Sequence, residues 1–286
     1  MAALDAQQNV PAAAARSAVA QASIDAPSLP VRIVAWCTLV FLVLPSLIII
    51  PMSFSSTEMM VFPPRLFSVH LYREFFFRAD WMVTAKQSLI VASFAALLSV
   101  ILGSMAAYGL VRTEFIGKKL VMMIFLTPIF VPLVVVALAF YIYFSVLRLQ
   151  GTTIALIAAH TAIVTPFVIV LITAALRKID PAIEVAAATM GAGRFYVYTR
   201  VTIPMVAPAV VSAGLFAFLL SFDELIIAIF LTGFGTKTLP VKMYESLIYE
   251  VSPVLAAIST LLTVLAFLIC ILIVRGQTAS GEGDVR

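Results

Sequence analysis

Six long apolar segments dominate this chain of 286 residues. Each is long enough to cross about 30 Å of hydrocarbon as a helix. None alternates apolar and polar residues in the manner of a strand in a membrane barrel. The sequence therefore predicts an all-α integral membrane protein with six transmembrane helices. These segments lie near residues 31–53, 84–111, 120–147, 153–176, 206–232 and 253–274.

Composition agrees with this fold class. Hydrophobic residues make up 63% of the chain and charged residues only 11%, which a soluble domain does not show. The formal net charge is +4, but Lys and Arg lie at the ends of apolar segments and not in one stripe. We expect membrane lipid, and not nucleic acid, to surround the protein.

The first 30 residues are rich in Ala, Gln, Ser and Pro, and they predict a disordered tail. No basic cluster precedes a short apolar core, so the tail does not resemble a signal peptide. The apolar segment 31–53 is too long to be one and is interpreted as an uncleaved anchor.

The placement of Lys and Arg predicts the orientation. Alternate loops differ in positive charge, and the more basic set is expected in the cytoplasm. Both termini and residues 177–205 are then cytoplasmic, while residues 54–83 face outward. The basic set holds Arg112, Lys118, Lys119, Arg177, Lys178, Arg194 and Arg200, with Arg32 and Arg275 beside the end segments; the other set holds Arg65, Arg73, Arg78, Arg148, Lys237 and Lys242. Aromatic residues of the outward loop predict an interfacial belt: Tyr72, Phe75, Phe76, Phe77 and Trp81.

Residues 177–205, which we call the elbow, form a polar island between two apolar segments. Asp180 is suited to cap a helix and Pro181 to its first position, and an Ala-rich run follows. Gly191 and Gly193 are expected to end that helix. A second short helix should run from Arg194 to Thr202 and stop at Pro204. Two interpretations stay open, namely a docking surface for another protein and a well-packed loop.

Asp223 and Glu224 are unusual because they fall inside the fifth apolar segment. Two acids in hydrocarbon are expected to face a cavity or a partner group. Adjacent residues of a helix point about 100° apart, so one would meet solute while the other holds structure. Binding of a cation and a structural salt bridge or hydrogen-bonded gate remain open as interpretations.

Small residues recur in segment 84–111 and predict close helix packing, while prolines such as Pro128, Pro132, Pro166 and Pro208 predict kinks. Cys37 and Cys270 lie in different segments and are interpreted as small apolar packing residues, not as a disulfide or metal pair. His160, alone in the fourth segment, is left unassigned.

The sequence gives no sign of an enzyme. It holds no phosphate-binding G-x-x-x-x-G-K-[ST] loop, no metal-ligand cluster and no nucleophile–base pair at recognisable spacing. We therefore expect no cofactor and no bound metal. If the protein uses ATP, another chain supplies the site.

The elbow also carries a family resemblance. Ala186-Ala187 and Gly191, then nine residues, then Val201-Thr202-Ile203-Pro204, resemble the E-A-A-x-x-x-G signature, with its following I-x-L-P, of MetI-like inner-membrane permeases of binding-protein-dependent ABC importers. Segments further along are similar to the C-type permease subunit of the spermidine/putrescine subfamily: Ser221-Phe222-Asp223-Glu224, Leu231-Thr232-Gly233, Thr238-Leu239-Pro240-Val241-Lys242-Met243-Tyr244 and, in the outer loop, Tyr72-Arg73-Glu74-Phe75-Phe76.

The resemblance implies a type I importer permease of a bacterial plasma (inner) membrane, with defined parts. These are a disordered tail (1–30), a first helix with an outer loop (31–83), a transport domain (84–274) with a coupling helix (180–204), and a cytoplasmic tail (275–286). Implied partners are a second permease, cytoplasmic ATP-binding subunits and a periplasmic or extracellular solute-binding protein. ATPase contacts are implied for Glu184, Val185, Ala186, Ala187, Gly191, Ile203 and Pro204, and the solute path for Asp223 and Glu224.

One residue departs from the signature. Val185 stands where the motif has Glu, and Glu184 lies one position earlier, about 100° round the helix. Contact with the ATPase through Glu184 at an angle, and an apolar contact instead, are both open.

Three functions compete at this point. The first is a transport subunit for a polyamine or a related amine, such as an opine or aminophosphonate. The second is a secondary transporter coupled to an ion through Asp223 and Glu224, although no inverted repeat is visible. An intramembrane enzyme is the third, and no catalytic constellation supports it.

Overall fold

The computed structural model describes residues 28–56, 62–64, 66–250 and 252–281, with side chains as far as residue 275. The described residues form helices joined by short links, and their only strand-like feature is an isolated bridge between Ser55 and Phe67. The chain divides into two compact units, residues 1–51 and 52–286. Most of the tail expected at residues 1–30 lies outside the described residues.

The first unit contributes one helix, α3 (Leu29–Met52). It is apolar over its full length, it contains Pro45 and Pro51, and none of its described side chains is buried. It meets the length and composition of a membrane span, as the sequence predicts.

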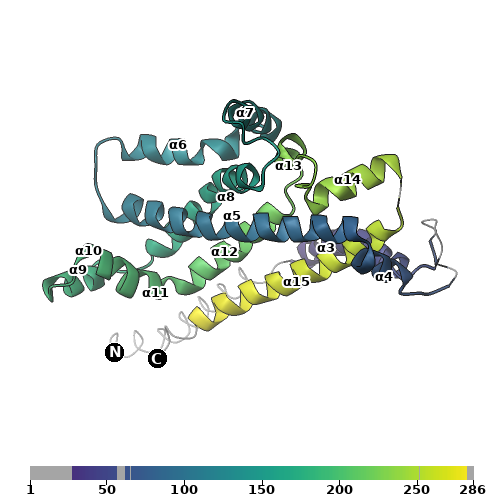
Figure 1. The fold of residues 1–286 in the computed structure, drawn as a ribbon. Coiled ribbons are helices and arrows are strands. Elements are labelled where there is room, and N and C mark those ends of the chain that lie inside the picture. The colour runs from purple at the N-terminus through teal and green to yellow at the C-terminus, as the bar shows by residue number, and fades with distance from the viewer. Residues whose placement is uncertain (1–27, 57–61, 65, 251, 282–286) are drawn as a thin grey trace, which may run out of the picture. The chain divides into compact units, whose positions relative to one another are not determined.

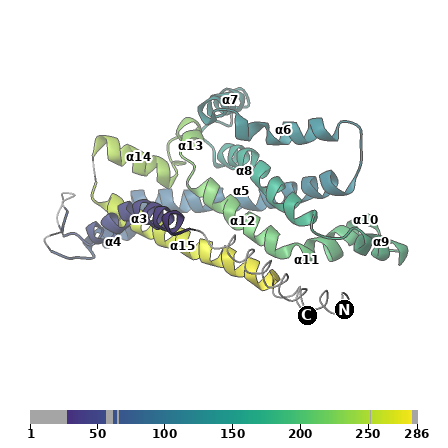
Figure 2. The same ribbon diagram turned by 180° about the vertical axis from the view of Figure 1, so that it is seen from behind.

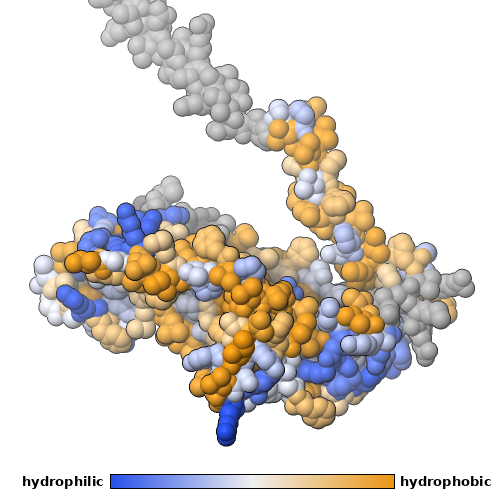
Figure 3. Space-filling model, turned by 90° about the horizontal axis from the view of Figure 1, so that it is seen from above, coloured by the Kyte–Doolittle hydropathy of each residue, from blue (hydrophilic) through white to orange (hydrophobic). Residues whose placement is uncertain are grey.

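The second unit is built around α5 (Ala79–Arg112), α8 (Thr153–Leu176), α12 (Ala207–Phe222) and α15 (Val254–Gly281), which run lengthwise through it (Figure 1). The elbow, with α9 (Ala182–Thr189), lies at one end, and α4 (His70–Phe77) and α14 (Leu239–Tyr249) lie at the other (Figure 2). We call these the elbow end and the opposite end. Figure 3 shows hydrophobic residues over the middle of this unit and hydrophilic residues gathered mainly near its two ends, as in a membrane protein.

Helix α5 forms the centre of this unit because its small residues allow close approach. Gly103 lies against Val168 of α8, and a Cβ at position 103 would be only 2.7 Å from Val168 Cγ1. Thr165 donates a hydrogen bond to Ser99 Oγ (3.2 Å), and Ser99 donates to the carbonyl of Thr161 (3.3 Å). The close packing predicted for segment 84–111 is confirmed.

The third apolar segment is not one straight span, and the kink that the sequence predicts at Pro132 is a sharp bend. It forms α6 (Lys118–Phe130) and α7 (Leu133–Val146), which are bent by 103° relative to each other. Pro132 lies at the break, and Val131 before it is extended. Proline disfavours the helical conformation of the residue before it, which explains the bend. Among the described residues, four helices are long and apolar enough to be single membrane spans, and the number rises to six if each bent pair counts as one span.

Two further expectations need correction. Phe75 and Trp81 are buried in the core with Leu239 and Ile258, so only part of the expected aromatic belt is exposed, at Phe76 and Phe77. Helix α15 continues to Gly281, beyond the end predicted near residue 274. Hydropathy alone does not separate an aromatic residue that faces lipid from one that fills a core.

Candidate functional site: the elbow and the acidic helix break

The first limb of the elbow, α9, forms as the sequence predicts. Oδ1 of Asp180 accepts a hydrogen bond from the backbone N–H of Ala182 (2.9 Å) and caps the helix. Gly191 follows the helix with φ +90°, a left-handed conformation that glycine adopts without a steric penalty. The N–H of Ala192 donates to the carbonyl of Ala187 (3.2 Å), which satisfies a free carbonyl at the helix end.

The second limb differs from its prediction. It consists of α10 (Arg194–Tyr196), the π-helical segment η1 (Val197–Thr202) and α11 (Ile203–Met205). The helical run therefore passes Pro204, which takes a position in the first turn of α11 where a proline is tolerated. The chain then turns by 79° into α12.

Large apolar side chains are exposed on the elbow. Val185, at the position of the motif Glu, is 61% exposed, and Met190 is 89% exposed. Ala186 and Pro204 are also exposed, while Ala187 and Ile203 are partly buried. Further large apolar residues exposed on the elbow are Ile183, Phe195, Tyr196 and Met205. A group of this kind on a helical surface is typical of a protein-binding site.

Glu184 is turned the other way, into the chain. Its carboxylate accepts hydrogen bonds from Arg112 Nε (2.9 Å), from Thr202 Oγ1 (3.0 Å) and, at 3.4 Å, from the hydroxyl of Tyr108. Both members of the ion pair with Arg112 are about 10% exposed at the side chain. Glu184 is therefore not part of the exposed surface of the elbow, and this geometry favours an apolar contact through Val185.

The sequence did not indicate these partners of Glu184. In the sequence, Arg112 follows an apolar segment and indicates only the orientation of the chain. The sequence places Thr202 in the family signature and at the end of a predicted helix but gives no sign of its contact with Glu184, and it does not single out Tyr108. Their pairing depends on how α5 and the elbow meet in space.

Asp223 and Glu224 lie at a break in the fifth apolar segment, and not within a continuous helix as the sequence predicts. Helix α12 ends at Phe222, and α13 (Ile226–Leu231) begins after Leu225. The carboxylate of Glu224 accepts hydrogen bonds from the backbone N–H groups of Ile227 (2.9 Å) and Ala228 (3.1 Å). These bonds cap the new helix and explain why the chain restarts here.

His160 packs beside this break. Its Nδ1 is 2.8 Å from Ser221 Oγ, and its Nε2 is 3.6 Å from Glu224 Oε2. The imidazole is 1% exposed. Residues of α8 and of the acidic break thus form one buried polar group.

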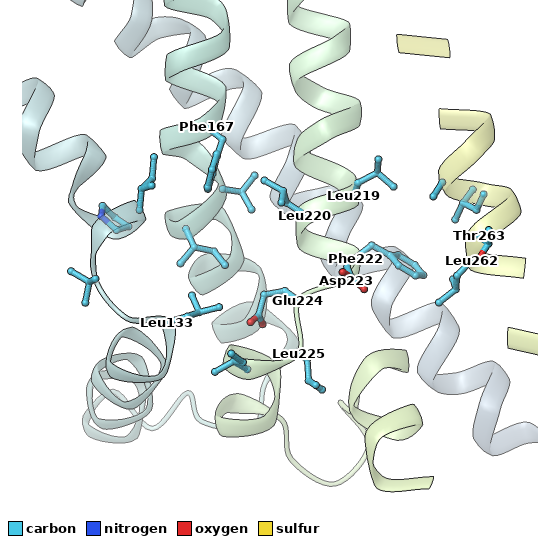
Figure 4. A pocket seen from close by; sticks show the side chains of 18 residues that line it. Leu133, Phe167, Leu219, Leu220, Phe222, Asp223, Glu224, Leu225, Leu262 and Thr263 are labelled. Atoms are coloured by element: carbon cyan, nitrogen blue, oxygen red, sulfur yellow. The ribbon is translucent and has the colours of Figure 1, made fainter. Parts of the chain in front are cut away.

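Asp223 faces an open pocket instead. The pocket has a volume of about 1020 Å³, and Asp223 and Glu224 are the only charged residues among the described residues that line it. Figure 4 shows the two carboxylates on different sides of the chain that connects α12 to α13, with Phe222, Leu262 and Thr263 near Asp223. Asp223 itself is exposed, whereas Glu224 is buried. The arrangement offers one accessible negative charge in an apolar cavity.

The structure does not support the packing role predicted for the two cysteines, since both thiols are free and exposed. Within the described residues, no group of three or more His, Cys, Asp or Glu is arranged to hold a metal ion.

Both candidate sites lie in a part of the chain that is similar to known proteins. Residues 99–279 match the family described as "Binding-protein-dependent transport system inner membrane component". This match includes the elbow and the acidic break.

Two relatives come from Escherichia coli (strain K12). The chain is 30% identical to the spermidine/putrescine transport system permease protein PotC over 253 residues, which are 86% of this chain and 94% of PotC. It is 34% identical to the putrescine transport system permease protein PotI over 230 residues, 78% of this chain and 81% of PotI.

Solved structures share the fold at lower identity. A chain from a bacterial ABC transporter involved in the import of alginate superimposes with a TM-score of 0.66 at 16% identity, covering 87% of this chain and 98% of that one. A chain from the alginate transporter in complex with its pentasaccharide-bound periplasmic protein gives 0.62 at 15% identity, covering 95% and 97%. The family match and the identity to PotC and PotI together show that this chain belongs to the inner-membrane permeases of binding-protein-dependent ABC importers.

Proposed function

We propose that this permease forms half of the path for a polyamine or a related amine and is driven by a separate ATPase that contacts the elbow. One observation supports an amine as the solute: the carboxylate of Asp223 is accessible in a pocket that is otherwise lined almost entirely by apolar residues. A single accessible anion beside apolar walls suits an amine solute that joins a positive charge to methylene groups. The names of the relatives PotC and PotI, spermidine/putrescine and putrescine permease, support the same solute class.

The elbow supports the coupling half of the proposal. Its exposed residues Val185, Met190 and Phe195 offer an apolar surface at one end of the helices. Helix α9 is capped by Asp180 and ends in the left-handed turn at Gly191, so this surface is ordered. A rigid surface passes a displacement on to the helices connected to it, whereas a flexible loop would change its own conformation instead.

The partners follow from the family. We infer a second permease that completes the path, cytoplasmic ATP-binding subunits at the elbow, and a solute-binding protein at the opposite end. The elbow end then faces the cytoplasm, as expected from the Lys and Arg residues gathered there. An ion-coupled secondary transporter is not supported, because the matched family and relatives are ABC permeases.

Reconstitution of the complete transporter in proteoliposomes tests the proposal. We expect ATP-dependent uptake of labelled putrescine or spermidine that requires the binding protein. Asp223→Asn should reduce uptake at least tenfold while ATPase binding is retained. Glu114→Gln removes an acid that is 88% exposed at the elbow end, and it should transport normally. Equal uptake by Asp223→Asn and the unaltered protein would reject an amine contact at this residue.

A further inference from the structure

From the contacts of its inner face, we infer that the elbow moves as one body with α5, and that the buried pair Glu184–Arg112 is the joint between them. Both are then positioning residues for ATP-driven transport, acting through the elbow and not on the solute. This inference rests on the proposed function, in which the ATPase pushes on the elbow.

Glu184 and Arg112 approach each other from the ends of two helices. Arg112 occupies the last turn of α5 and Glu184 the first turn of α9, so each charge is favoured by the helix end that carries it. The guanidinium of Arg112 also donates from Nη2 to the carbonyl of Ile179 (3.2 Å). Thr202, from η1, donates to the same carboxylate. One buried carboxylate therefore joins α5 to both limbs of the elbow.

A second set of contacts lies one to two turns further into α5. The hydroxyls of Ser104 and Tyr198 are 2.8 Å apart, and the rings of Tyr108 and Tyr198 meet edge to face with centroids 5.1 Å apart. Tyr198 belongs to η1, and π-helical turns of this kind are frequent at functional sites. The elbow is thus held to α5 at two levels, so it cannot pivot about a single contact.

The elbow is connected to α12 and α8 through the chain itself, unlike its contact with α5. The elbow joins α12 through the 79° bend before Ala207 and joins α8 through the short link after Leu176. Helix α5 has no chain connection to the elbow, yet it receives the buried charges and the aromatic contact. A displacement of the elbow is therefore delivered directly to α5.

Helix α5 can carry that displacement to the opposite end. It has 34 residues, and at 1.5 Å per residue it is about 50 Å long. Ser88 Oγ, near its start, accepts a hydrogen bond from the N–H of Leu239 in α14 (2.7 Å), and Gln87 donates to Thr153 Oγ1 of α8 (2.9 Å). The elbow and the helix at the far end are bonded to the same rigid element.

A distance measurement in the complete transporter tests whether they move together. Spin labels replace Met105, exposed on α5, and Ala188, exposed on α9, in a background with Cys37→Ser and Cys270→Ser. We expect the same distance without nucleotide and with trapped ATP. In Glu184→Gln the distribution should broaden. A nucleotide-dependent change of several ångströms in the unaltered joint would overturn the inference.

Transport by the variants gives the functional readout. Glu184→Gln and Arg112→Gln should retain the ATPase and its basal hydrolysis but lose at least tenfold in solute moved per ATP. Arg112→Lys keeps the charge and should restore part of that coupling. Lys119→Gln, an exposed cation at the same end, should behave normally. Normal coupling in both Gln variants would overturn the inference, whereas failure of the unaltered chain to bind the ATPase would instead refute the proposed function.

Discussion

The carboxylates of Asp223 and Glu224 belong to adjacent residues but serve different surroundings. Glu224 accepts two backbone hydrogen bonds at the start of α13 and lies beside His160, whereas Asp223 faces the pocket of about 1020 Å³. The helix break makes this division possible, because Asp223 still completes the last turn of α12 whereas Glu224 caps the start of α13. One acid holds the break in place and the other stays accessible.

We predict that Glu224→Ala destabilises the protein by about 1 kcal/mol or more, since two backbone N–H groups lose their acceptor. Asp223→Asn is the matched control and should leave stability unchanged, because its side chain is exposed. Thermal unfolding in detergent measures the stability of both variants, with loss of monodispersity of the purified chain as the signal. A stable Glu224→Ala with an unstable Asp223→Asn would contradict the division of roles.

Gly103 should tolerate no side chain. A Cβ would lie 2.7 Å from Val168 Cγ1, so Gly103→Ala is expected to push α5 and α8 apart and cost about 1–3 kcal/mol. Gly109→Ala on the same helix is the control, because a Cβ there meets nothing within 4 Å. Unfolding temperatures compare the two, and Val168→Ala should partly rescue the first. Equal stability of the two alanine variants would show that the helices have room to adjust.

Gly191 is expected to be needed for coupling and not for membrane insertion. Its φ is +90°, and a Cβ at this position would meet nothing within 4 Å, so no neighbouring group would clash with a side chain. Gly191→Leu should therefore strain only the backbone, by about 1 kcal/mol or more, and misplace the two limbs. It should insert normally but lose uptake and stimulated ATP hydrolysis.

Gly193 provides the control for that experiment. It has φ −68° and open surroundings, so Gly193→Ala should keep full activity. Gly191→Asn should keep part of it, because Asn enters the left-handed region more readily than Leu. Full uptake by Gly191→Leu would remove the docking role of this turn.

The orientation is open to direct measurement. In a background with Cys37→Ser and Cys270→Ser, single cysteines replace Met190 on the elbow and Phe234 in the link before α14, both highly exposed. An impermeant thiol reagent added to intact cells should label position 234 and leave position 190 unlabelled. Tags at the two termini should also be protected. Labelling at position 190 from outside would reverse the proposed topology.

Features that depend on neighbours along the chain could be predicted from the sequence. Apolar length identified the spans at α3, α5, α8 and α15, because a helix satisfies its own backbone wherever hydrocarbon surrounds it. The Asp180 cap and the Gly191 turn were predictable for the same reason, since each involves hydrogen bonds over a few residues. Residue spacing in the elbow was enough to identify the family.

Which polar groups are buried together depends on how the helices pack. Arg112 and Glu184 are 72 positions apart in the chain, and His160 and Ser221 are 61 apart, so no local pattern records their pairing. Hydropathy averages over a window, and it therefore treated residues 206–232 as one span although Glu224 caps a new helix inside it. The free energy of a buried charge depends on the partners that folding brings to it, and those partners lie on other helices.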